Sequence, residues 1–314
     1  MMLKKTTILL SVATAVCAAA AANPAPTQTP MRVRIVAETF PIYDWARQIL
    51  GERLDETDLA LLQQSGADLH GYSPSAADLR KIATCDLFVF TGGTSDGWTE
   101  RALARHGNPN RRVLNLVKTL GIKEHDHDEH DHKKHEHNTD EHVWLSLRHA
   151  ATLVKAITDN LAALDPANAT TYRANANTYC ERLAILDHAY AKAVAGAKRK
   201  TILVADRFPF RHLTEDYGIA HYAAFSGCSA ESEASFKTVA RLAKKVDELE
   251  LPVILVIEGS NHRLAETVRR TTKSRDQRIL TFNSLQSVGG DATKTTRYID
   301  VMAQNLETLK AALN

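Results

Sequence analysis

The segment from residue 125 to residue 137 concentrates side chains that bind metal ions. It holds six of the chain's 14 histidines together with five carboxylates and no apolar residue. Such a segment cannot pack into a core, and closely spaced imidazoles suit Zn, Cu and Ni. We therefore predict an auxiliary metal-capturing loop, rather than a plain hydrophilic linker or a pH-responsive loop. Its histidines are His125, His127, His130, His132, His135 and His137.

Two further histidines lie where regular elements are expected to begin. His142 follows Asp140-Glu141 and opens an apolar run just after the His-rich segment. His70 lies in a glycine-flanked loop after the apolar run 59–62, shortly before a Ser-Pro pair that begins a predicted helix. An isolated histidine is as readily structural as it is a ligand, so the residue types alone leave both roles open.

The elements that must position these side chains alternate between short apolar runs and segments of helical periodicity. Strands separated by helices indicate parallel sheets, which bind ligands beyond the carboxyl ends of their strands. The predicted strands form an N-terminal group and a C-terminal group. They are 32–37, 59–62, 87–91 and 113–117, then 201–205, 253–258 and 278–282.

A long helical stretch separates the two groups of strands. Leu153, Ile157 and Leu161 recur at helical spacing and share one face. Asp165-Pro166 then predicts the start of a second helix, with Asp as N-cap and Pro in the first turn. The predicted fold class is α/β, with two parallel-sheet lobes joined by a long rigid helical connection and a cleft between them.

The first residues are typical of a secretory signal. Two lysines precede an apolar run at 7–22 that ends in small residues, which predicts cleavage before about Asn23. The run is shorter than the roughly 20 residues that a membrane anchor needs. Cys17 would permit lipid anchoring, but the bulky Val16 before it disfavours this alternative. We expect a periplasmic or otherwise extracytoplasmic protein.

The sequence therefore divides into five predicted segments. They are a signal peptide at 1–22, a spacer at 23–30, an N-terminal α/β lobe at 31–144 that includes the His-rich loop 123–139, linking helices at 145–198, and a C-terminal α/β lobe at 199–314.

Charge and cysteine content exclude two classes of protein. Without the signal, 37 basic and 37 acidic residues remain, so the basic excess that nucleic-acid binding requires is lacking. The three cysteines then left, Cys85, Cys180 and Cys228, are too few and too widely spaced for a disulfide framework. One bridge at most can form, and the pairing stays open.

Several motifs, taken in order along the chain, resemble one family. They are the loop histidine before Pro-Ser, the segment 83–89, the His-rich insertion, the segment 140–145 that contains Asp-Glu-His-Val-Trp-Leu, and the segments 205–208, 216–218 and 256–258. In this combination they resemble ZnuA-like proteins, the extracytoplasmic metal-binding components of ABC importers for zinc, within the cluster A-I metal substrate-binding proteins. The resemblance covers nearly all of the mature chain.

This resemblance implies that metal binds in the cleft between two lobes bridged by a rigid helix. His70 and His142 match the family's first two histidine ligands. The third ligand position falls on Ala205, which has no donor, and the fourth falls near Asn283, a neutral and weaker ligand. Because zinc generally takes four donors, the site must be completed by other groups or stay partly open to water.

Asp206 and Glu258, both at the ends of predicted strands, are our candidates to complete the metal set. Alternatively, Asp206 pairs with a neighbouring arginine and Glu258 caps the following helix. Cys228 and Glu231, on a glycine-containing loop, are further candidates, although the thiol would also suit a packed position. The remaining candidates are expected to be surface or structural histidines: His188, His212, His221 and His262.

The leading functional interpretation is a monomeric, non-enzymatic binding protein that captures Zn²⁺ and delivers it to the membrane permease of an ABC importer. Imidazole ligands favour zinc over manganese and leave nickel and copper open. Since coordination needs neutral imidazole, affinity should fall below about pH 6.5. One alternative is a zinc-dependent hydrolase with an open metal site, although an H-E-x-x-H motif is absent. Another is a metal-buffering protein or adhesin without a transporter.

Overall fold

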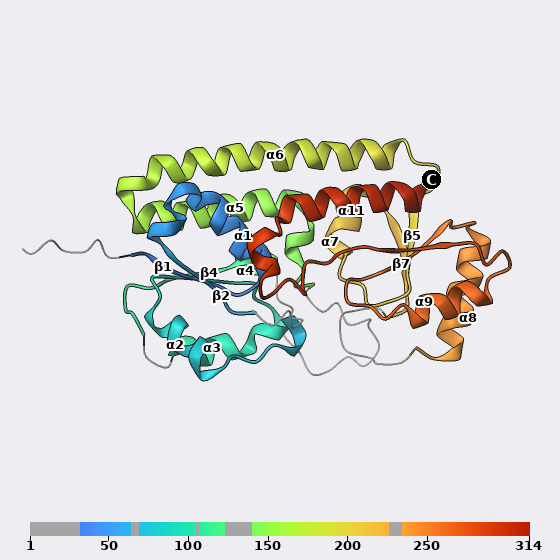
Figure 1. The fold of residues 1–314 in the computed structure, drawn as a ribbon, viewed down its shortest axis with the longest axis horizontal. Helices are drawn as coiled ribbons and strands as arrows, with labels where there is room; N and C mark the ends of the chain where they lie inside the picture. The colour runs from blue at the N-terminus through green and yellow to red at the C-terminus, as the bar shows by residue number, and fades with distance from the viewer. Residues whose placement is uncertain (1–31, 64–68, 105–106, 123–139, 226–233) are drawn as a thin grey trace, which may run out of the picture. The chain divides into compact units, whose positions relative to one another are not determined.

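Two parallel four-stranded sheets carry the fold, and both have the same topology (Figure 1). The first has the order β2-β1-β3-β4 and the second the order β6-β5-β7-β8, with every neighbouring pair parallel. The strands are β1 (Arg34–Ala37), β2 (Asp58–Leu61), β3 (Leu87–Phe90), β4 (Arg112–Asn115), β5 (Thr201–Val204), β6 (Ala220–Ala223), β7 (Val253–Val256) and β8 (Arg278–Thr281). The predicted class of two α/β lobes is confirmed.

The computed structural model describes residues 32–63, 69–104, 107–122, 140–225 and 234–314. These residues belong to one compact unit, Arg32–Asn314. The predicted signal peptide and spacer, and the His-rich loop, lie outside the described residues. Among the described helices, none is both long enough and apolar enough to cross a bilayer.

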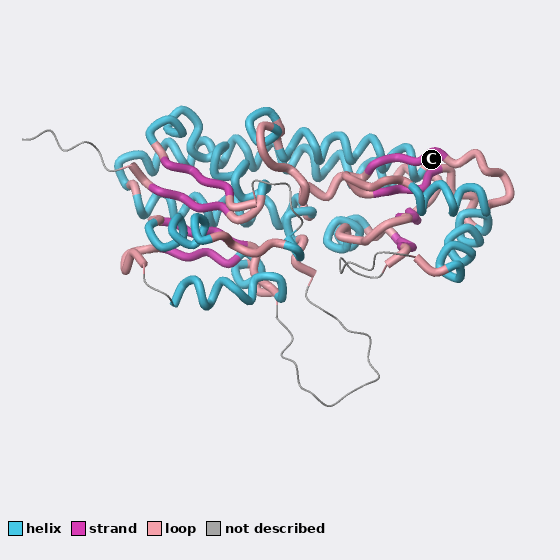
Figure 2. The backbone as a smooth tube through the Cα atoms, turned by 60° about the horizontal axis from the view of Figure 1, so that its bottom comes forward, coloured by secondary structure: helices cyan, strands magenta, loops and turns pink. Residues whose placement is uncertain are grey.

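Helices surround the strands of both sheets (Figure 2). The α-helices are α1 (Phe40–Leu50), α2 (Ala76–Thr84), α3 (Gly97–Ala104), α4 (Leu116–Thr119), α5 (Leu147–Leu164), α6 (Ala169–Ala195), α7 (Arg211–Tyr217), α8 (Phe236–Glu248), α9 (Arg263–Thr271), α10 (Ala292–Thr295) and α11 (Tyr298–Leu313). Short 3₁₀ turns are η1 (Gly51–Glu56), η2 (Leu69–Gly71), η3 (Thr94–Asp96), η4 (Val143–Leu145) and η5 (Pro166–Asn168).

Helix α6 supports both lobes. Its 27 residues pack against α5 and α1 on the side of the first sheet and against α11 and α7 on the side of the second (Figure 1). The turn before it differs slightly from the prediction, because Pro166 begins the 3₁₀ turn η5 and α6 starts only at Ala169. Asp165 stabilises this start by accepting a 2.6 Å hydrogen bond from the Tyr172 hydroxyl.

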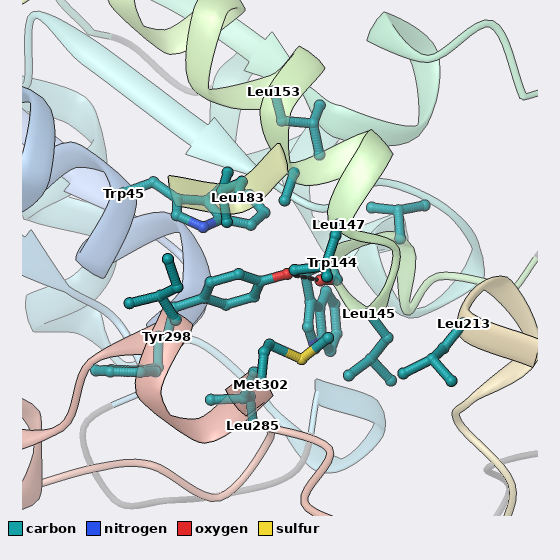
Figure 3. Close-up of a cluster of buried hydrophobic side chains, with 14 of the residues drawn as sticks. Trp45, Trp144, Leu145, Leu147, Leu153, Leu183, Leu213, Leu285, Tyr298 and Met302 are labelled. Carbon is teal, nitrogen blue, oxygen red and sulfur yellow. Dashed lines mark hydrogen bonds between the residues drawn. The ribbon is translucent and has the colours of Figure 1, made fainter. Parts of the chain in front are cut away.

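One continuous hydrophobic core extends from β1 in the first lobe to α11 in the second. Figure 3 shows its centre, where Trp45 of α1 and Tyr298 of α11 meet edge to face with ring centroids 5.2 Å apart. The backbone N–H of Tyr298 donates to Asp44 at 2.8 Å. The indole N–H of Trp144 donates to the carbonyl of Ser284 at 2.8 Å. The two lobes therefore share one large hydrophobic cluster, and each lobe also packs a smaller cluster of its own.

Two strand predictions differ from the structure. The predicted strand 113–117 ends at Asn115, because this side chain caps α4 by accepting from the backbone N–H of Lys118 at 2.9 Å. The edge strand β6 was not predicted, since its sequence Ala-His-Tyr-Ala lacks a run of large apolar residues. It pairs with β5 on one side only.

Candidate metal centre

His142 lies directly before η4 and α5, and its imidazole is held by a neighbouring carboxylate. The side chain is buried, with 3 % of the residue exposed. Asp140 Oδ1 accepts both the backbone N–H of His142 at 2.9 Å and a hydrogen bond from Nδ1 at 2.7 Å. Because a carboxylate only accepts, the ring proton belongs on Nδ1, which puts the lone pair on Nε2.

His70 lies in the 3₁₀ turn η2, between β2 and α2. Its Nδ1 is 2.8 Å from the hydroxyl oxygen of Ser95 in η3. The ring centroids of His70 and His142 are 5.3 Å apart, and the rings are tilted by 56°. The structure thus brings together two histidines that are separated by most of the first lobe in sequence. Because Nδ1 is hydrogen-bonded in each ring, Nε2 is the nitrogen that metal coordination would use.

Local sequence explains why both loops adopt these positions. Ser75 forms a capping box with Asp78, which fixes the start of α2 just after His70. Ser146 caps α5 by accepting from the backbone N–H of His149 at 3.0 Å, which fixes the chain just after His142. Both histidines therefore precede a well-capped helix.

Glu141 joins the two histidine loops. Its carboxylate is 2 % exposed, and Oε1 accepts from the Thr94 hydroxyl and from the Ser95 backbone N–H, both at 2.7 Å. Oε2 lies 3.9 Å from Nδ1 of His70. Gly93, with a φ of +95°, makes room for this side chain, since a Cβ there would lie 2.6 Å from Cγ of Glu141. The buried carboxyl group of Glu141 thus lies beside His70.

Sequence reasoning missed the supporting residues Asp140, Glu141 and Ser95. The signals were available: the two acidic residues directly precede His142, and Ser95 follows the predicted third strand at its carboxyl end. Carboxylates and hydroxyls that bond the outer nitrogen of a ligating histidine are the usual support of a metal site.

Asp140 is ionised although it is mostly buried. Burial alone would raise its pKa, but the interactions with His142 and His212 outweigh this effect, so the pKa of the carboxyl lies below its ordinary value. His212 of α7 contacts the same residue, with Nε2 2.9 Å from the carbonyl oxygen of Asp140. The ring of His149 packs edge to face on His212 at 5.1 Å.

In the second lobe, the loop after β5 contains Ala205 and Asp206. Ala205 is 1 % exposed and donates its backbone N–H to the carbonyl of Leu255 at 2.8 Å, so it continues the pairing of β5 with β7. Asp206 Oδ1 accepts the backbone N–H of Arg207 at 2.9 Å. This local bond occupies one carboxylate oxygen of the predicted ligand.

Glu258, at the end of β7, holds the loop that follows β8. Oε2 accepts from the backbone N–H of Ser284 at 2.7 Å, while Oε1 accepts from the Ser284 hydroxyl at 2.6 Å and the backbone N–H of Gln286 at 3.0 Å. The predicted alternative was a cap on the following helix. The observed hydrogen bonds of Glu258 instead go to the loop after β8. Asn283 also serves this loop, accepting from the backbone N–H of Leu285 at 2.8 Å.

Within the part of the chain that the structure describes, no three His, Cys, Asp or Glu side chains gather in the geometry of a metal site. His70 and His142 lie together, whereas Asp206 and Glu258 do not join them in such a group. Cys228, Glu231 and the six histidines of 125–137 lie outside the described residues. Of the described cysteines, Cys85 and Cys180 are free thiols.

His70 and His142 form a pair of imidazoles, and Nδ1 of each ring is hydrogen-bonded. The pair lies on a two-lobed scaffold of parallel sheets. These features define the class as a two-lobed metal-binding protein. The chain belongs to the family described as zinc-uptake complex component A, periplasmic, which it matches over residues 35–312. The recognised resemblance to ZnuA-like proteins is thereby confirmed.

Similar proteins agree with this assignment. The chain is 32% identical over 318 residues to the zinc-binding lipoprotein AdcA of Streptococcus pneumoniae, with 98% of this chain and 61% of AdcA covered. The high-affinity zinc uptake system protein ZnuA of Bacillus subtilis is 29% identical, with 90% and 88% covered. The Zn(II)-bound ZnuA-like domain of S. pneumoniae AdcA superposes with a TM-score of 0.72 at 30% identity, covering 90% of this chain and 99% of that domain. The chain therefore spans about three fifths of AdcA's length.

Proposed function

We propose that this chain captures Zn²⁺ outside the cytoplasm and delivers it to the permease of an ABC importer. The observation that carries the proposal is the pairing of His70 and His142, with centroids 5.3 Å apart and each Nδ1 already hydrogen-bonded. Membership of a zinc-uptake family and the names of the similar proteins support zinc as the cargo. Capture and delivery need binding only, so no catalytic turnover is part of the proposal.

The full ligand set proposed is His70, His142, Asp206 and Glu258. The last two follow β5 and β7, which are neighbours in the second sheet, so both lie at its carboxyl edge, where parallel sheets bind ligands. Glu258 would have to exchange its bonds to Ser284 and Gln286 for the metal. Zinc binding should therefore rearrange the loop after β8.

The cellular arrangement proposed with this function keeps the segments predicted from the sequence. A signal at 1–22 is removed, and the mature protein works as a periplasmic or otherwise extracytoplasmic monomer. The His-rich loop raises the local zinc concentration and passes ions to the paired histidines. Its deletion, over residues 125–137, should slow zinc loading or lower stoichiometry while one tight site remains.

Calorimetric zinc titration with a competing chelator tests the central proposal. The full chain should show one tight site that is abolished in His70→Ala and in His142→Ala. His188→Ala, which alters an exposed histidine of α6, is the matched control and should bind as the unaltered chain does. Tight binding that survives the loss of both His70 and His142 would refute the proposed site.

A further inference from the structure

A histidine of the second lobe reaches the metal-binding loop of the first. His212 lies in α7, 72 residues beyond Asp140 in sequence, and its Nε2 is 2.9 Å from the Asp140 carbonyl oxygen. A carbonyl can only accept, so Nε2 of His212 carries a proton and donates it. This nitrogen is thus committed to the protein backbone and is not placed to bind metal.

Both the backbone carbonyl and the side-chain carboxylate of Asp140 accept hydrogen bonds. Its carbonyl accepts from His212, while its carboxylate accepts from the backbone N–H and from Nδ1 of His142 at 2.9 and 2.7 Å. The position of residue 140 therefore determines where the His142 ring points and which of its nitrogens carries the proton. Three residues form one connected chain from α7 to the metal-binding imidazole.

Surrounding contacts restrict His212. The ring of His149, in the first turn of α5, packs against it edge to face with centroids 5.1 Å apart. Helix α7 also packs against η4, the turn that directly follows His142. The second lobe thus contacts α5 through an aromatic pair, in addition to the hydrogen bond from His212 to Asp140.

We propose that His212 is a positioning residue for zinc binding, which orients His142 through Asp140. The inference rests on the proposed function and deepens it. Ala205, on which the resemblance places the family's third ligand position, is buried and has no side-chain donor. The second lobe thus affects zinc binding through the hydrogen bond from His212 to the loop that carries His142, in addition to any zinc ligand that the second lobe itself supplies.

Two variants of the full chain separate the hydrogen bond from mere bulk. His212→Ala removes the donor, whereas His212→Gln retains a side-chain N–H at a similar reach. Removal of an outer partner of a metal-ligating histidine typically weakens metal binding by roughly 10–100-fold, and because His212 acts one residue further out we expect about tenfold for His212→Ala. His212→Gln should regain most of this loss, and His188→Ala should show none.

A second readout does not depend on zinc. The ¹⁵N shifts of the His142 ring in the metal-free chain, assigned by their loss in His142→Ala, report its tautomer. We expect mainly the Nδ1-protonated form in the unaltered chain and in His212→Gln, and a mixture in His212→Ala. An unchanged tautomer in His212→Ala, or a zinc affinity equal to that of the unaltered chain, would overturn the proposal. If the unaltered chain itself lacked a tight zinc site, the proposed function would fail, while the tautomer would still decide the role of His212.

Discussion

The hydroxyl of Tyr298 donates a 2.6 Å hydrogen bond to the backbone carbonyl of Trp144, two residues beyond His142. Tyr298 is the first residue of α11 and is fully buried. The bond therefore ties the last helix of the chain to the turn that directly follows His142, a proposed zinc ligand. It is visible at the centre of Figure 3.

Replacing Tyr298 with Phe should destabilise the protein without altering its shape. The change leaves the buried Trp144 carbonyl without its partner, which costs about 1–3 kcal/mol in the free energy of unfolding. Urea denaturation of the metal-free chain measures this. Tyr43→Phe is the control, because the Tyr43 hydroxyl makes no hydrogen bond to another described residue; equal stability of the two variants would contradict the prediction.

Loss of the Ser95 hydroxyl should weaken zinc binding. Ser95→Ala removes the partner of His70 Nδ1, and loss of such a partner lowers metal affinity by roughly 10–100-fold. Ser95→Thr keeps the hydroxyl and should bind more tightly than the alanine variant. Ser287→Ala, at an exposed position, provides the control in the same chelator competition assay. Equal affinities for Ser95→Ala and the unaltered chain would show that His70 needs no such support.

Glu38 should make the stability of the protein fall as pH rises above the ordinary pKa of a glutamate. The carboxyl is fully buried, and burial, followed by the charge and hydrogen bond of Asp96, raises the pKa of Glu38 well above its ordinary value. The folded chain therefore keeps a proton that the unfolded chain releases above about pH 4.5. This contribution to stability is complete below that pH and is lost as pH rises through the folded pKa.

Glu38→Gln should remove that dependence. The amide can still accept from the Thr91 backbone N–H, which lies 2.7 Å from Glu38 Oε2, and can donate to Asp96 permanently. The stability of the variant relative to the unaltered chain should rise with pH, by at most about 1.4 kcal/mol per pH unit. Urea unfolding at pH 5 and pH 8 tests this, and parallel pH profiles for the two chains would refute it.

His149 should make stability depend on pH in the opposite direction, so that the protein becomes less stable as pH is lowered. Burial first, and then the charge of His212, lower the pKa of His149, although Asp216 and Glu215 partly oppose this. Below about pH 6.5 the unfolded chain binds a proton that the folded chain resists, so stability falls as pH falls through the folded pKa. His149→Gln should show a smaller loss of thermal stability between pH 7.5 and pH 5.

The control for this experiment is His188→Gln, because His188 is exposed on α6. Its melting temperature should follow that of the unaltered chain at both pH values. His221 also has a pKa lowered by burial and by Arg211, so part of the acid sensitivity should remain in His149→Gln. If His149→Gln lost as much thermal stability between pH 7.5 and pH 5 as the unaltered chain, groups other than His149 would cause the acid sensitivity.

The scaffold was largely predictable, because its strands are buried runs that differ sharply from the helices around them. The strand 253–256, with every residue buried, is the clearest case, and the half-exposed edge strand 220–223 is the one that periodicity missed. The paired histidines were also identified, through the motifs around them. Their partners were not, because the pairing of Ser95 with His70 depends on β2 and β3 flanking β1, which no local pattern reveals.

Glu258 illustrates the same limit. Its position at a strand end predicted a metal ligand or a cap on the following helix, whereas its observed partners lie 26 and 28 residues further along the chain. They meet it because β7 and β8 are adjacent and parallel, so that their carboxyl ends lie side by side. Adjacency of strands follows from packing of the whole lobe and not from the residues near Glu258.

The contact between α1 and the start of α11 has a consequence for the order of synthesis. Asp44 leaves the ribosome 254 residues before Tyr298, whose N–H it accepts, and Arg47 likewise awaits the carbonyls of Thr293 and Thr296. Contacts of such long sequence separation form late. The first lobe can gather its strands early, but its packing is completed only when almost the whole chain has been translated, so premature termination before residue 298 would leave both lobes unfinished.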